Sequence, residues 1–318
     1  MKKRGIVYKS TGSWYTVKGD DGKIYPSRIK GKFRIQGIKS TNPVAVGDVV
    51  ILKVETKGDE EVGVIQEIEE RKNYIIRKSV NLSKQTHILA SNVDLACLLV
   101  TYNNPTTSTT FIDRFLVTAE AYHIPVLLLF NKVDAYTIEE FAEIKYLAEL
   151  YRNIGYTCVG ISAETGKNID EVKDLMKGKK VLLSGHSGVG KSTLANALQP
   201  GLNLKTSSIS LQHQQGQHTT TFAEMYDLDF GAQLIDTPGI RGFGVVDIDE
   251  NELGNYFPEF FERKQNCKFN NCKHIEEPKC AIKNALEQDE IAYSRYKSYL
   301  QIMNNEDEQY RTDVYGEK

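Results

Sequence analysis

Just after the apolar residues 181–183 and one serine, the chain reads Gly185-His186-Ser187-Gly188-Val189-Gly190-Lys191-Ser192-Thr193. This stretch fits the pattern G-x-x-x-x-G-K-[ST], in which glycines let successive backbone N–H groups curl around a phosphate chain. A helix that begins here points its positive end at the same anion. Lys191 would pair with the β- and γ-phosphates, and the Ser192 hydroxyl would bind Mg²⁺. Because the pattern falls on a strand-to-helix junction, we expect a nucleotide-binding loop rather than an incidental glycine-rich turn.

The surrounding residues 82–245 alternate apolar segments with amphipathic ones. The apolar segments are predicted strands at residues 95–100, 126–130, 181–183 and 233–235. Two of the predicted helices begin with capping boxes, Thr137 with Glu140 and Asn168 with Glu171. This alternation favours an α/β domain with a mainly parallel sheet.

Two polar motifs precede the phosphate loop, each at the end of a predicted strand. Asn131-Lys132-Val133-Asp134 follows residues 126–130, and Ser162-Ala163 follows residues 156–161. The Asp134 carboxylate can accept two hydrogen bonds from the N1–H and N2–H₂ edge of guanine, which adenine cannot offer. Asn131 would bridge to the phosphate loop, and Lys132 would lie along the base. Either motif alone is compatible with an ordinary loop, but together they predict a GTP site that includes Ser162 and Ala163.

Two further motifs follow the phosphate loop. Asp236-Thr237-Pro238-Gly239 ends the predicted strand 233–235 and matches the D-x-x-G element of GTPases. In this element Asp236 would reach Mg²⁺ through water, and the Gly239 N–H would sense the γ-phosphate. Upstream, residues 216–221 read Gly-Gln-His-Thr-Thr-Thr and offer hydroxyls for a second Mg²⁺ contact. Thr220 is the preferred ligand and Thr219 the alternative.

The order of these motifs is rotated relative to most GTPases. The guanine motif at residue 131 and Ser-Ala at residue 162 come before the phosphate loop at residue 185. All the motifs would line the carboxyl ends of one sheet. Cutting an ordinary GTPase chain between its third motif, D-x-x-G, and its fourth, the guanine motif, and joining the old ends would therefore leave the pocket intact. We therefore expect a circularly permuted P-loop GTPase domain.

The segment in front of this domain has a different texture. Residues 1–73 show short alternating segments separated by turn signals, which favours a small antiparallel barrel or sandwich. Residues 1–40 hold 11 Lys and Arg against 2 Asp and Glu, so the formal net charge of −2 for the whole chain hides a basic end. Basic residues interleaved with aromatic ones suit an OB-type surface that binds RNA, although some of those rings could equally be core. These residues are Lys9, Trp14, Tyr15, Lys18, Lys23, Tyr25, Arg28, Lys32, Phe33 and Arg34.

Behind the domain, residues 246–318 contain a Cys/His cluster and then a stripe of apolar residues at helical spacing: Ile282, Leu286, Tyr293, Tyr296, Leu300 and Met303. The cluster comprises Cys267, Cys272, His274 and Cys280. These four are the ligand set of a closed structural Zn²⁺ site, which leaves no open position for water. The ion would therefore fold this segment rather than catalyse. Cys97 and Cys158 fall in apolar strands and are predicted core thiols.

Length and composition fit a chain of more than one domain. The 318 residues exceed the roughly 250 to 300 at which a single core stops growing. No apolar run approaches the roughly 20 residues needed to cross a bilayer, and no apolar segment follows the basic residues 2–4 as it would in a signal peptide. Because three of the five cysteines cluster as metal ligands do, we expect a cytoplasmic protein in a reducing compartment, with no membrane partner.

The rotated motif order, the Gly-x-His-Thr-Thr-Thr segment, the basic barrel in front and the Cys/His module behind resemble the ribosome small-subunit-dependent GTPase family RsgA, also called YjeQ. This resemblance covers nearly the whole chain. It implies an OB-fold at residues 1–73, a circularly permuted GTPase domain at residues 82–245 and an α-helical zinc-binding domain at residues 246–318. It also implies a monomer that binds GTP, GDP, the 30S subunit and its 16S rRNA late in maturation. Hydrolysis of GTP would be faster on the subunit and would control release.

The sequence lacks the glutamine that usually orients the attacking water in GTPases. Ras-type enzymes place a water-orienting Gln directly after D-x-x-G, and here Ile240 stands at that position. His218 is the best intrinsic candidate to orient the water, and the resemblance implies that this histidine acts. The alternatives are a solvent-exposed histidine without a role and a group supplied by the partner. With Lys191 and Gly239, His218 forms the predicted catalytic set.

Other functions fit only part of the pattern. A binding module could carry a nucleotide that merely stiffens the fold, but it would not need the Mg²⁺ residues Ser192, Thr220 and Asp236. An ATPase or kinase that uses ATP does not fit Asp134, because this carboxylate would select guanine over adenine. Stimulation by the 50S rather than the 30S subunit would favour the permuted GTPases of large-subunit assembly.

Overall fold

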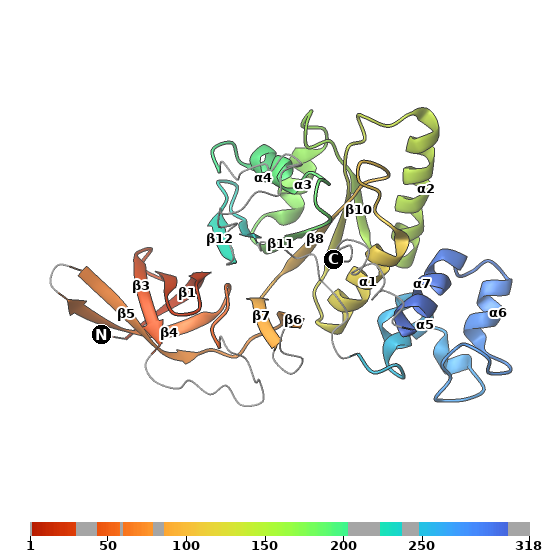
Figure 1. The fold of residues 1–318 in the computed structure, drawn as a ribbon, viewed down its shortest axis with the longest axis horizontal. Coiled ribbons are helices and arrows are strands. Elements are labelled where there is room, and N and C mark those ends of the chain that lie inside the picture. The colour runs from red at the N-terminus through yellow and green to blue at the C-terminus, as the bar shows by residue number, and fades with distance from the viewer. Residues whose placement is uncertain are drawn as a thin grey trace, which may run out of the picture.

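The computed structural model describes residues 2–29, 43–57, 60–78, 86–202, 223–236 and 248–304. Three parts follow one another along the long axis of the molecule: a β barrel, a sheet covered by helices, and a small helical module (Figure 1). No helix within these ranges is long and apolar enough to cross a membrane. The domain limits expected at residues 73, 82, 245 and 246 stay predictions.

The first part is a closed barrel. It is built from β1 (Lys2–Ser10), β2 (Tyr15–Gly19), β3 (Ile24–Ile29), β4 (Val49–Lys57) and β5 (Glu60–Ile68). The strand order is β1-β2-β3-β5-β4, and pairing of β1 with β4 closes it. β3 and β5 run parallel, so the expectation of a purely antiparallel barrel was wrong in this one pair, whereas an all-β, OB-like barrel is confirmed.

Burial shows which aromatic residues belong to the core of the barrel. Tyr15 and Tyr25 are 2% and 1% exposed and pack with Val7, Val17 and other apolar residues inside the barrel. Trp14, at the turn between β1 and β2, is 53% exposed. Of these rings, only that of Trp14 is available to a partner.

The second part is an α/β sheet. Its strands are β8 (Leu95–Val100), β9 (Val126–Phe130), β10 (Thr157–Gly160), β11 (Lys180–Ser184), β12 (Glu224–Asp227) and β13 (Gln233–Asp236). They are ordered β10-β9-β8-β11-β13-β12, all parallel except the antiparallel strand β12. A mainly parallel sheet is confirmed, and β11, which leads into the phosphate loop, lies between β8 and β13.

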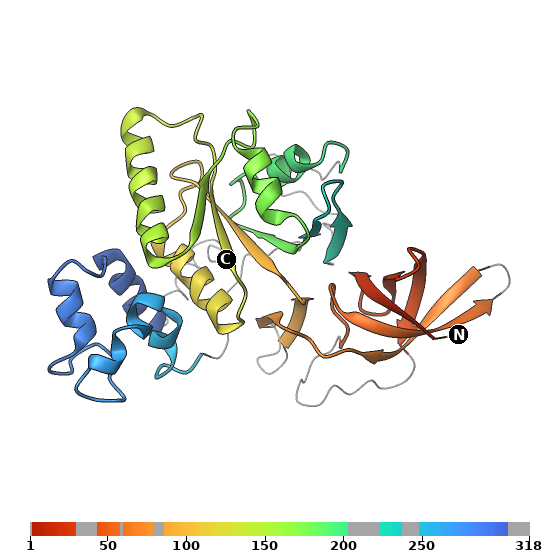
Figure 2. The same cartoon turned by 180° about the vertical axis from the view of Figure 1, so that it is seen from behind.

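Helices cover both faces of this sheet, as Figure 2 shows from behind. They are α1 (Thr109–Ala121), α2 (Ile138–Ile154), α3 (Ile169–Met176) and α4 (Lys191–Leu198). Successive side chains of β8 point to opposite faces of the sheet: Leu98 packs with α1 and α2, and Cys97 packs with α3 and α4. Burial on both faces explains why these strands read as continuous apolar runs. Cys97 and Cys158 are buried, which confirms them as core thiols.

The two capping-box predictions had different outcomes. The Thr137 hydroxyl accepts from the Glu140 N–H, and the Glu140 carboxylate accepts from the Thr137 N–H, so the first box is confirmed. Asn168 adopts a left-handed conformation with φ 58° and makes no side-chain cap, so the second is wrong. Its amide instead donates to the Gly160 carbonyl at 2.7 Å, because the left-handed backbone lets the side chain reach the end of β10.

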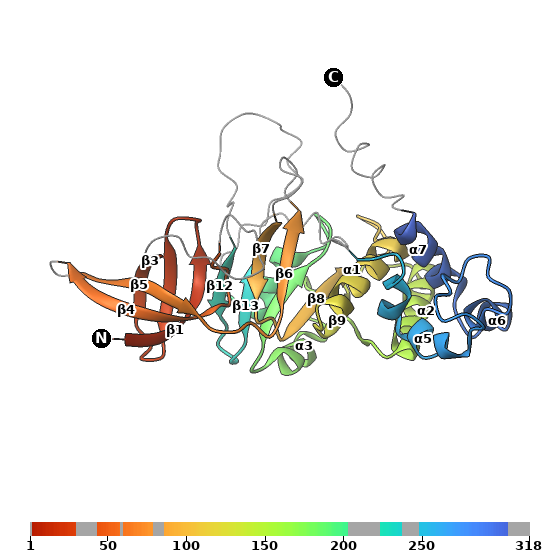
Figure 3. The ribbon, with the colours of Figure 1, turned by 90° about the horizontal axis from the view of Figure 1, so that it is seen from below.

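The barrel is joined to the sheet at β12 (Figure 3). β1 pairs with β12 at Lys9 and Glu224, and the Lys9 Nζ lies 2.9 Å from the Glu224 carboxylate. Lys18 Nζ lies 2.5 Å from Asp227, whose other oxygen accepts from the Tyr8 hydroxyl at 2.6 Å. Two lysines expected on an RNA-binding surface are therefore engaged in this junction. A short ribbon of β6 (Tyr74–Lys78) and β7 (Thr86–Ser91) lies between barrel and sheet.

The third part is a small helical module. It contains the 3₁₀ turns η1 (Leu253–Tyr256) and η2 (Lys264–Asn266) and the helices α5 (Pro258–Phe261), α6 (Ala281–Glu287) and α7 (Tyr293–Met303). The apolar spacing at 282–303 thus belongs to two helices rather than one. Phe257, Phe260 and Ile282 are fully buried in its core, but Tyr293, predicted for the same stripe, is 70% exposed at the start of α7.

A buried charge network docks this module onto the sheet domain. Arg295 in α7 is 1% exposed and donates from Nε and Nη2 to the two oxygens of Glu259 at 2.7 and 3.0 Å. Its Nη1 donates to Asp113 of α1 at 2.6 Å, and the Tyr151 hydroxyl of α2 donates to the same oxygen. Burial raises the pKa of Asp113, and the Arg295 guanidinium opposes that shift. The carboxylates therefore depend on this one cation.

Replacing Arg295 with Met is expected to destabilise the docked module by about 3 to 5 kcal/mol, because two buried carboxylates lose their partner. Urea unfolding, followed by far-ultraviolet circular dichroism, measures the change in the free energy of unfolding. Arg263→Met is the matched control, since Arg263 Nε lies 3.5 Å from Glu290 at the surface and such pairs contribute about 0 to 1 kcal/mol. Equal losses in the two variants would show that the buried network does not hold the module.

Candidate nucleotide-binding site and metal centre

The phosphate loop links β11 to α4. Gly185, Gly188 and Gly190 have φ of 143°, 86° and 101°, a region that side chains with a Cβ rarely adopt. Gly190 is the N-cap residue of α4, so the loop leads straight into the helix amino terminus. Lys191 Nζ donates to the carbonyls of Gly185 and His186, both at 2.6 Å. The lysine therefore lies over the loop, where an anion held by its N–H groups would be within reach.

Asn131 connects three of the predicted motifs. Its side chain is 2% exposed, and its Nδ2 donates to the Val189 carbonyl of the phosphate loop at 2.8 Å. Its Oδ1 accepts from the Ala163 N–H at 3.0 Å. The structure thus brings the guanine motif, the Ser-Ala motif and the phosphate loop together, and it places Asn131 in the bridging position expected from the sequence.

The other residues of the guanine motif lie around the same edge. Lys132 has φ 67°, and its Nζ donates to the Gly188 carbonyl at 3.1 Å and to the Asn104 carbonyl. Val133 is half-buried, and its N–H donates to the Ile161 carbonyl at 3.2 Å. Asp134 is exposed at the end of the motif, and Ser162 of the Ser-Ala motif is fully buried. The Asp134 carboxylate is therefore accessible to a base.

Gly190→Ala is expected to weaken GDP binding by roughly tenfold or more. A Cβ at this position would lie 2.5 Å from the Asn131 Nδ2, so the bridging amide must shift and lose about 1 to 2 kcal/mol of hydrogen bonding. Gly155→Ala is the control, because Gly155 has a similar φ of 114° but open space around it. Fluorescence titration with a labelled GDP measures both affinities, and an unaffected Gly190→Ala would contradict the role given to Asn131.

Asp236 ends β13, the neighbour of β11 in the sheet. It lies close enough to Lys191 of the phosphate loop for the two charges to interact. Burial raises the pKa of Asp236, Lys191 opposes the shift and Glu224 adds to it. Ser192 and Thr193 are half-buried in the first turn of α4. The predicted residues His218, Thr219, Thr220 and Gly239 lie outside the described residues.

Two contacts were not predicted from the sequence, one at the phosphate loop and one at the guanine motif. The His186 ring stacks on Phe111 of α1 with centroids 3.8 Å apart, and burial lowers the His186 pKa. The Tyr136 hydroxyl donates to the Asn131 carbonyl at 2.7 Å and accepts from the Tyr102 N–H at 3.0 Å. A usable signal existed, because the loop after β8 must lie beside the phosphate loop once β8 is placed next to β11.

The Cys/His cluster forms a possible metal centre. One ligand atom from each of Cys267, Cys272, His274 and Cys280 lies within 4.8 Å of the others. His274 Nδ1 is 3.7 Å from the Cys267 sulfur and 3.4 Å from the Cys280 sulfur. A tetrahedral ion with bonds of about 2.3 Å to sulfur and 2.0 to 2.1 Å to nitrogen separates its ligand atoms by roughly 3.5 to 3.8 Å. The four side chains therefore fit a closed, four-coordinate metal ion.

Hydrogen bonds fix the backbone around this cluster. The Tyr296 hydroxyl donates to the His274 carbonyl and the Tyr299 hydroxyl donates to the Lys273 carbonyl, both at 2.7 Å. The Cys267 sulfur accepts from the Ala281 N–H at 3.4 Å. These bonds come from α6 and α7, so the metal ligands are held against the helices of the module.

Family comparison decides which proteins this chain resembles. A model described as the RsgA GTPase matches residues 68–246, more than half of the chain, and one described as the RsgA N-terminal domain matches residues 4–65. The chain belongs to the RsgA GTPase family. It is therefore a GTP-hydrolysing enzyme, and the permuted order of its motifs is a property shared with RsgA relatives.

RsgA relatives cover the whole length of the chain. The small ribosomal subunit biogenesis GTPase RsgA of Christiangramia forsetii is 71% identical over 312 residues, 98% of this chain and 99% of the relative. The protein of the same name from Flavobacterium psychrophilum is 61% identical over 98% of this chain and 96% of its own. The structure of YjeQ from Thermotoga maritima superposes with a TM-score of 0.78 at 36% identity, covering 96% of this chain and 98% of that one. YloQ, described as a circularly permuted GTPase, gives 0.73 at 31%, over 97% and 96%.

Proposed function

We propose that this chain is a GTPase that acts in the late maturation of the 30S ribosomal subunit. The observation that carries the proposal is the 71% identity, over nearly the full length of both chains, to a protein named for small ribosomal subunit biogenesis. The Asn131 bridge supports it, because it assembles the phosphate loop and the guanine motif into one pocket. The protein would bind as a monomer in the cytoplasm and contact 16S rRNA.

Each predicted residue has a role in this pocket. Asp134 would accept the N1–H and N2–H₂ groups of guanine, and the phosphates would lie against the loop N–H groups and Lys191. Ser192 and Thr220 would bind the Mg²⁺ that accompanies the nucleotide, and Asp236 would reach it through water. When bound, Mg²⁺ neutralises charge that develops on the phosphates.

Hydrolysis needs a group that orients water for attack on the γ-phosphorus, in line with the bond to the leaving GDP. Lys191 stabilises the phosphate charge, and the Gly239 N–H holds the γ-phosphate. Ile240 has no polar atom, so His218 is the intrinsic group that would orient the water. Contact with the ribosomal subunit would place His218 against the attacking water and accelerate the reaction, and loss of the γ-phosphate would release the protein.

His218→Ala is expected to bind GTP normally and to lose most of the turnover that the 30S subunit stimulates, by roughly 10²- to 10⁴-fold, the range of a positioned acid–base group. His213→Ala, in the same part of the sequence, is the control and should keep its turnover. Phosphate release at saturating 30S subunits measures both. Unchanged turnover in His218→Ala would remove this residue from the mechanism.

Zn²⁺ is the ion that the Cys₃His cluster would hold, as one structural ion. We also propose three domains, at residues 1–73, 82–245 and 246–318. Lys264, Lys268, Lys273, Lys279 and Lys283 surround the ligands and would meet rRNA phosphates. The zinc module and the basic barrel would then hold the subunit from two sides of the GTPase domain.

The deciding experiment measures GTP turnover with the protein alone, with purified 30S subunits and with purified 50S subunits. The proposal predicts strong stimulation by 30S only. Stimulation by 50S only would move the protein to large-subunit assembly, and no stimulation by either would leave a GTPase without this partner.

A further inference from the structure

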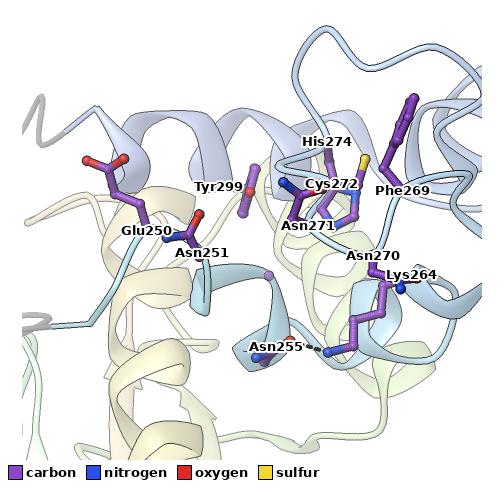
Figure 4. Close-up of a pocket in the computed structure, with 11 residues that line it drawn as sticks. Glu250, Asn251, Asn255, Lys264, Phe269, Asn270, Asn271, Cys272, His274 and Tyr299 are labelled. Atoms are coloured by element: carbon purple, nitrogen blue, oxygen red, sulfur yellow. Dashed lines mark hydrogen bonds between the residues drawn. The ribbon is translucent and has the colours of Figure 1, made fainter.

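A polar cavity of about 210 Å³ lies in the helical module beside the metal cluster (Figure 4). Its lining includes Cys272 and His274 but not Cys267 or Cys280, so it is not the space of the metal ion itself. It is smaller than the roughly 300 to 1,000 Å³ of pockets that enclose drug-sized ligands. A cavity of this size suits one ring system rather than a whole cofactor.

Side-chain amides form part of the lining. They belong to Asn251, Asn255, Asn270 and Asn271. The Asn255 Oδ1 accepts from Lys264, and the Asn251 Nδ2 donates to Asp249 at 2.8 Å, so each of these residues keeps its other amide atom. Within the described part of the chain, the amides of Asn270 and Asn271 make no side-chain hydrogen bond, and both residues are exposed. The cavity therefore presents neutral donors and acceptors side by side.

An aromatic ring stands at the same cavity. Phe269 lines it and is 39% exposed, and the ammonium of Lys268 lies 5.2 Å from the ring centroid. An exposed ring beneath a cation can stack a flat ligand on one side while the cation meets a phosphate. Phe261 is a similar ring, 55% exposed and 4.7 Å from the Lys264 ammonium, but it does not line the cavity.

The lining excludes several kinds of ligand. A phosphate would meet the carboxylate of Glu250, which pairs with Lys273 outside the lining at 3.3 Å. The cation in the lining, Lys264, is held by Asn255. An apolar side chain seated here would cover the amides without offering them hydrogen-bond partners, which is unfavourable. What remains is a neutral, planar group with hydrogen-bonding edges.

We propose that this cavity takes an unstacked nucleobase of single-stranded RNA, stacked on Phe269 and read along its edge by the asparagine amides. Sequence-specific RNA recognition uses unpaired bases in this way. The basic segment 263–283 carries 6 Lys and Arg against 2 Asp and Glu, so the phosphates on either side of the base would lie near lysines rather than inside the cavity. The inference deepens the proposed function by naming what the zinc module would hold.

The test compares matched pairs in the full, metal-loaded chain. Binding of a fluorescent single-stranded RNA 12-mer is measured by anisotropy at fixed salt, next to a duplex of the same sequence. Phe269→Ala is expected to weaken single-strand binding about tenfold, as loss of one stacked base does, whereas Phe261→Ala changes it less than about twofold. Asn270→Leu should weaken it several-fold, and Asn266→Leu, outside the cavity, should not. Duplex binding stays the same throughout.

Cross-linking locates the base directly. RNA carrying 4-thiouridine should cross-link to residues 264–274 in the unaltered chain, and Phe269→Ala should abolish this cross-link. Metal content stays at one ion per chain in every variant, which shows that the module remains folded.

Equal losses in Phe269→Ala and Phe261→Ala, or an equal loss on the duplex, would overturn the proposal. Cross-links confined to the barrel, or mononucleotides that bind as tightly as the 12-mer, would also overturn it. The oligonucleotide assays use no ribosomes, so their failure is separate from a failure of 30S stimulation in the turnover assay.

Discussion

Removing the metal is expected to make three of the five cysteines reactive while two stay protected. Cys267, Cys272 and Cys280 lie in the metal cluster, whereas Cys97 and Cys158 are buried in strands of the central sheet. A thiol reagent without denaturant should therefore modify no cysteine in the metal-loaded protein and three after chelation. Full unfolding would expose all five.

The physical reason is that residues 264–280 have little regular structure of their own. Apart from the short turn η2, this segment has no helix or strand, and besides a few hydrogen bonds, such as those that Tyr296 and Tyr299 donate to its backbone, the four ligands are what bring its parts together. Burial raises the pKa of the Cys272 and Cys280 thiols, so a cation is needed to hold them as thiolates. Structural Zn²⁺ contributes about 10 to 16 kcal/mol of apparent binding free energy in zinc-finger peptides.

Mass spectrometry of the modified protein counts and locates the reactive thiols. Cys280→Ser should reproduce the loss of metal, and Cys158→Ser, the control, should keep one ion per chain. The docked helix α7 should remain after chelation, because the Arg295 network does not involve the cluster. Protection of all five cysteines after chelation would contradict a structural metal, and modification of all five would show that the ion supports the central sheet as well.

The sequence predicted those features that a local pattern or a recognisable motif marks. Strands at 95–100 and 126–130 were found with their observed bounds, because runs of apolar residues of strand length are buried on both faces of a parallel sheet. The Asn131 bridge could be placed because the loop patterns and their strand ends fix which residues meet. The Cys/His set was found because metal ligands have a restricted chemistry.

Features that depend on distant contacts were not predicted. Arg295 and Asp113 are 182 positions apart, and no local pattern marks either as part of a buried pair. The Lys9–Glu224 junction spans 215 positions, and as a result the barrel lysine was assigned to an RNA surface. The cap predicted at Asn168 was wrong for a different reason. Its sequence pattern matches that of Thr137, but Asn168 is left-handed at this turn, and its side-chain amide donates to the Gly160 carbonyl instead.

Asp134→Asn is expected to exchange guanine for xanthine selectivity. The carboxylate would accept from both N1–H and N2–H₂ of guanine, and an amide offers one acceptor and one donor, so its NH₂ would face the guanine NH₂. Loss of hydrogen bonds to a charged group costs about 2 to 4 kcal/mol, which corresponds to a roughly 30- to 1,000-fold weaker GTP affinity. Xanthine has a carbonyl at position 2, so the amide pairs with it and XTP binding should improve.

The measurement is a pair of titrations, with GTP and with XTP, on the unaltered chain and the variant. Asp170→Asn is the matched control, because Asp170 lies outside the motif with its side chain 97% exposed and should leave both affinities unchanged. A fall in GTP affinity without a gain for XTP would mean that the substitution disturbed the loop, since Lys132 and Val133 beside it hold Gly188 and Ile161. An unchanged preference for GTP would show that another group reads the base. A reversal of preference in Asp134→Asn alone would tie base recognition to this carboxylate, because no general loss of the site can strengthen binding to a second nucleotide.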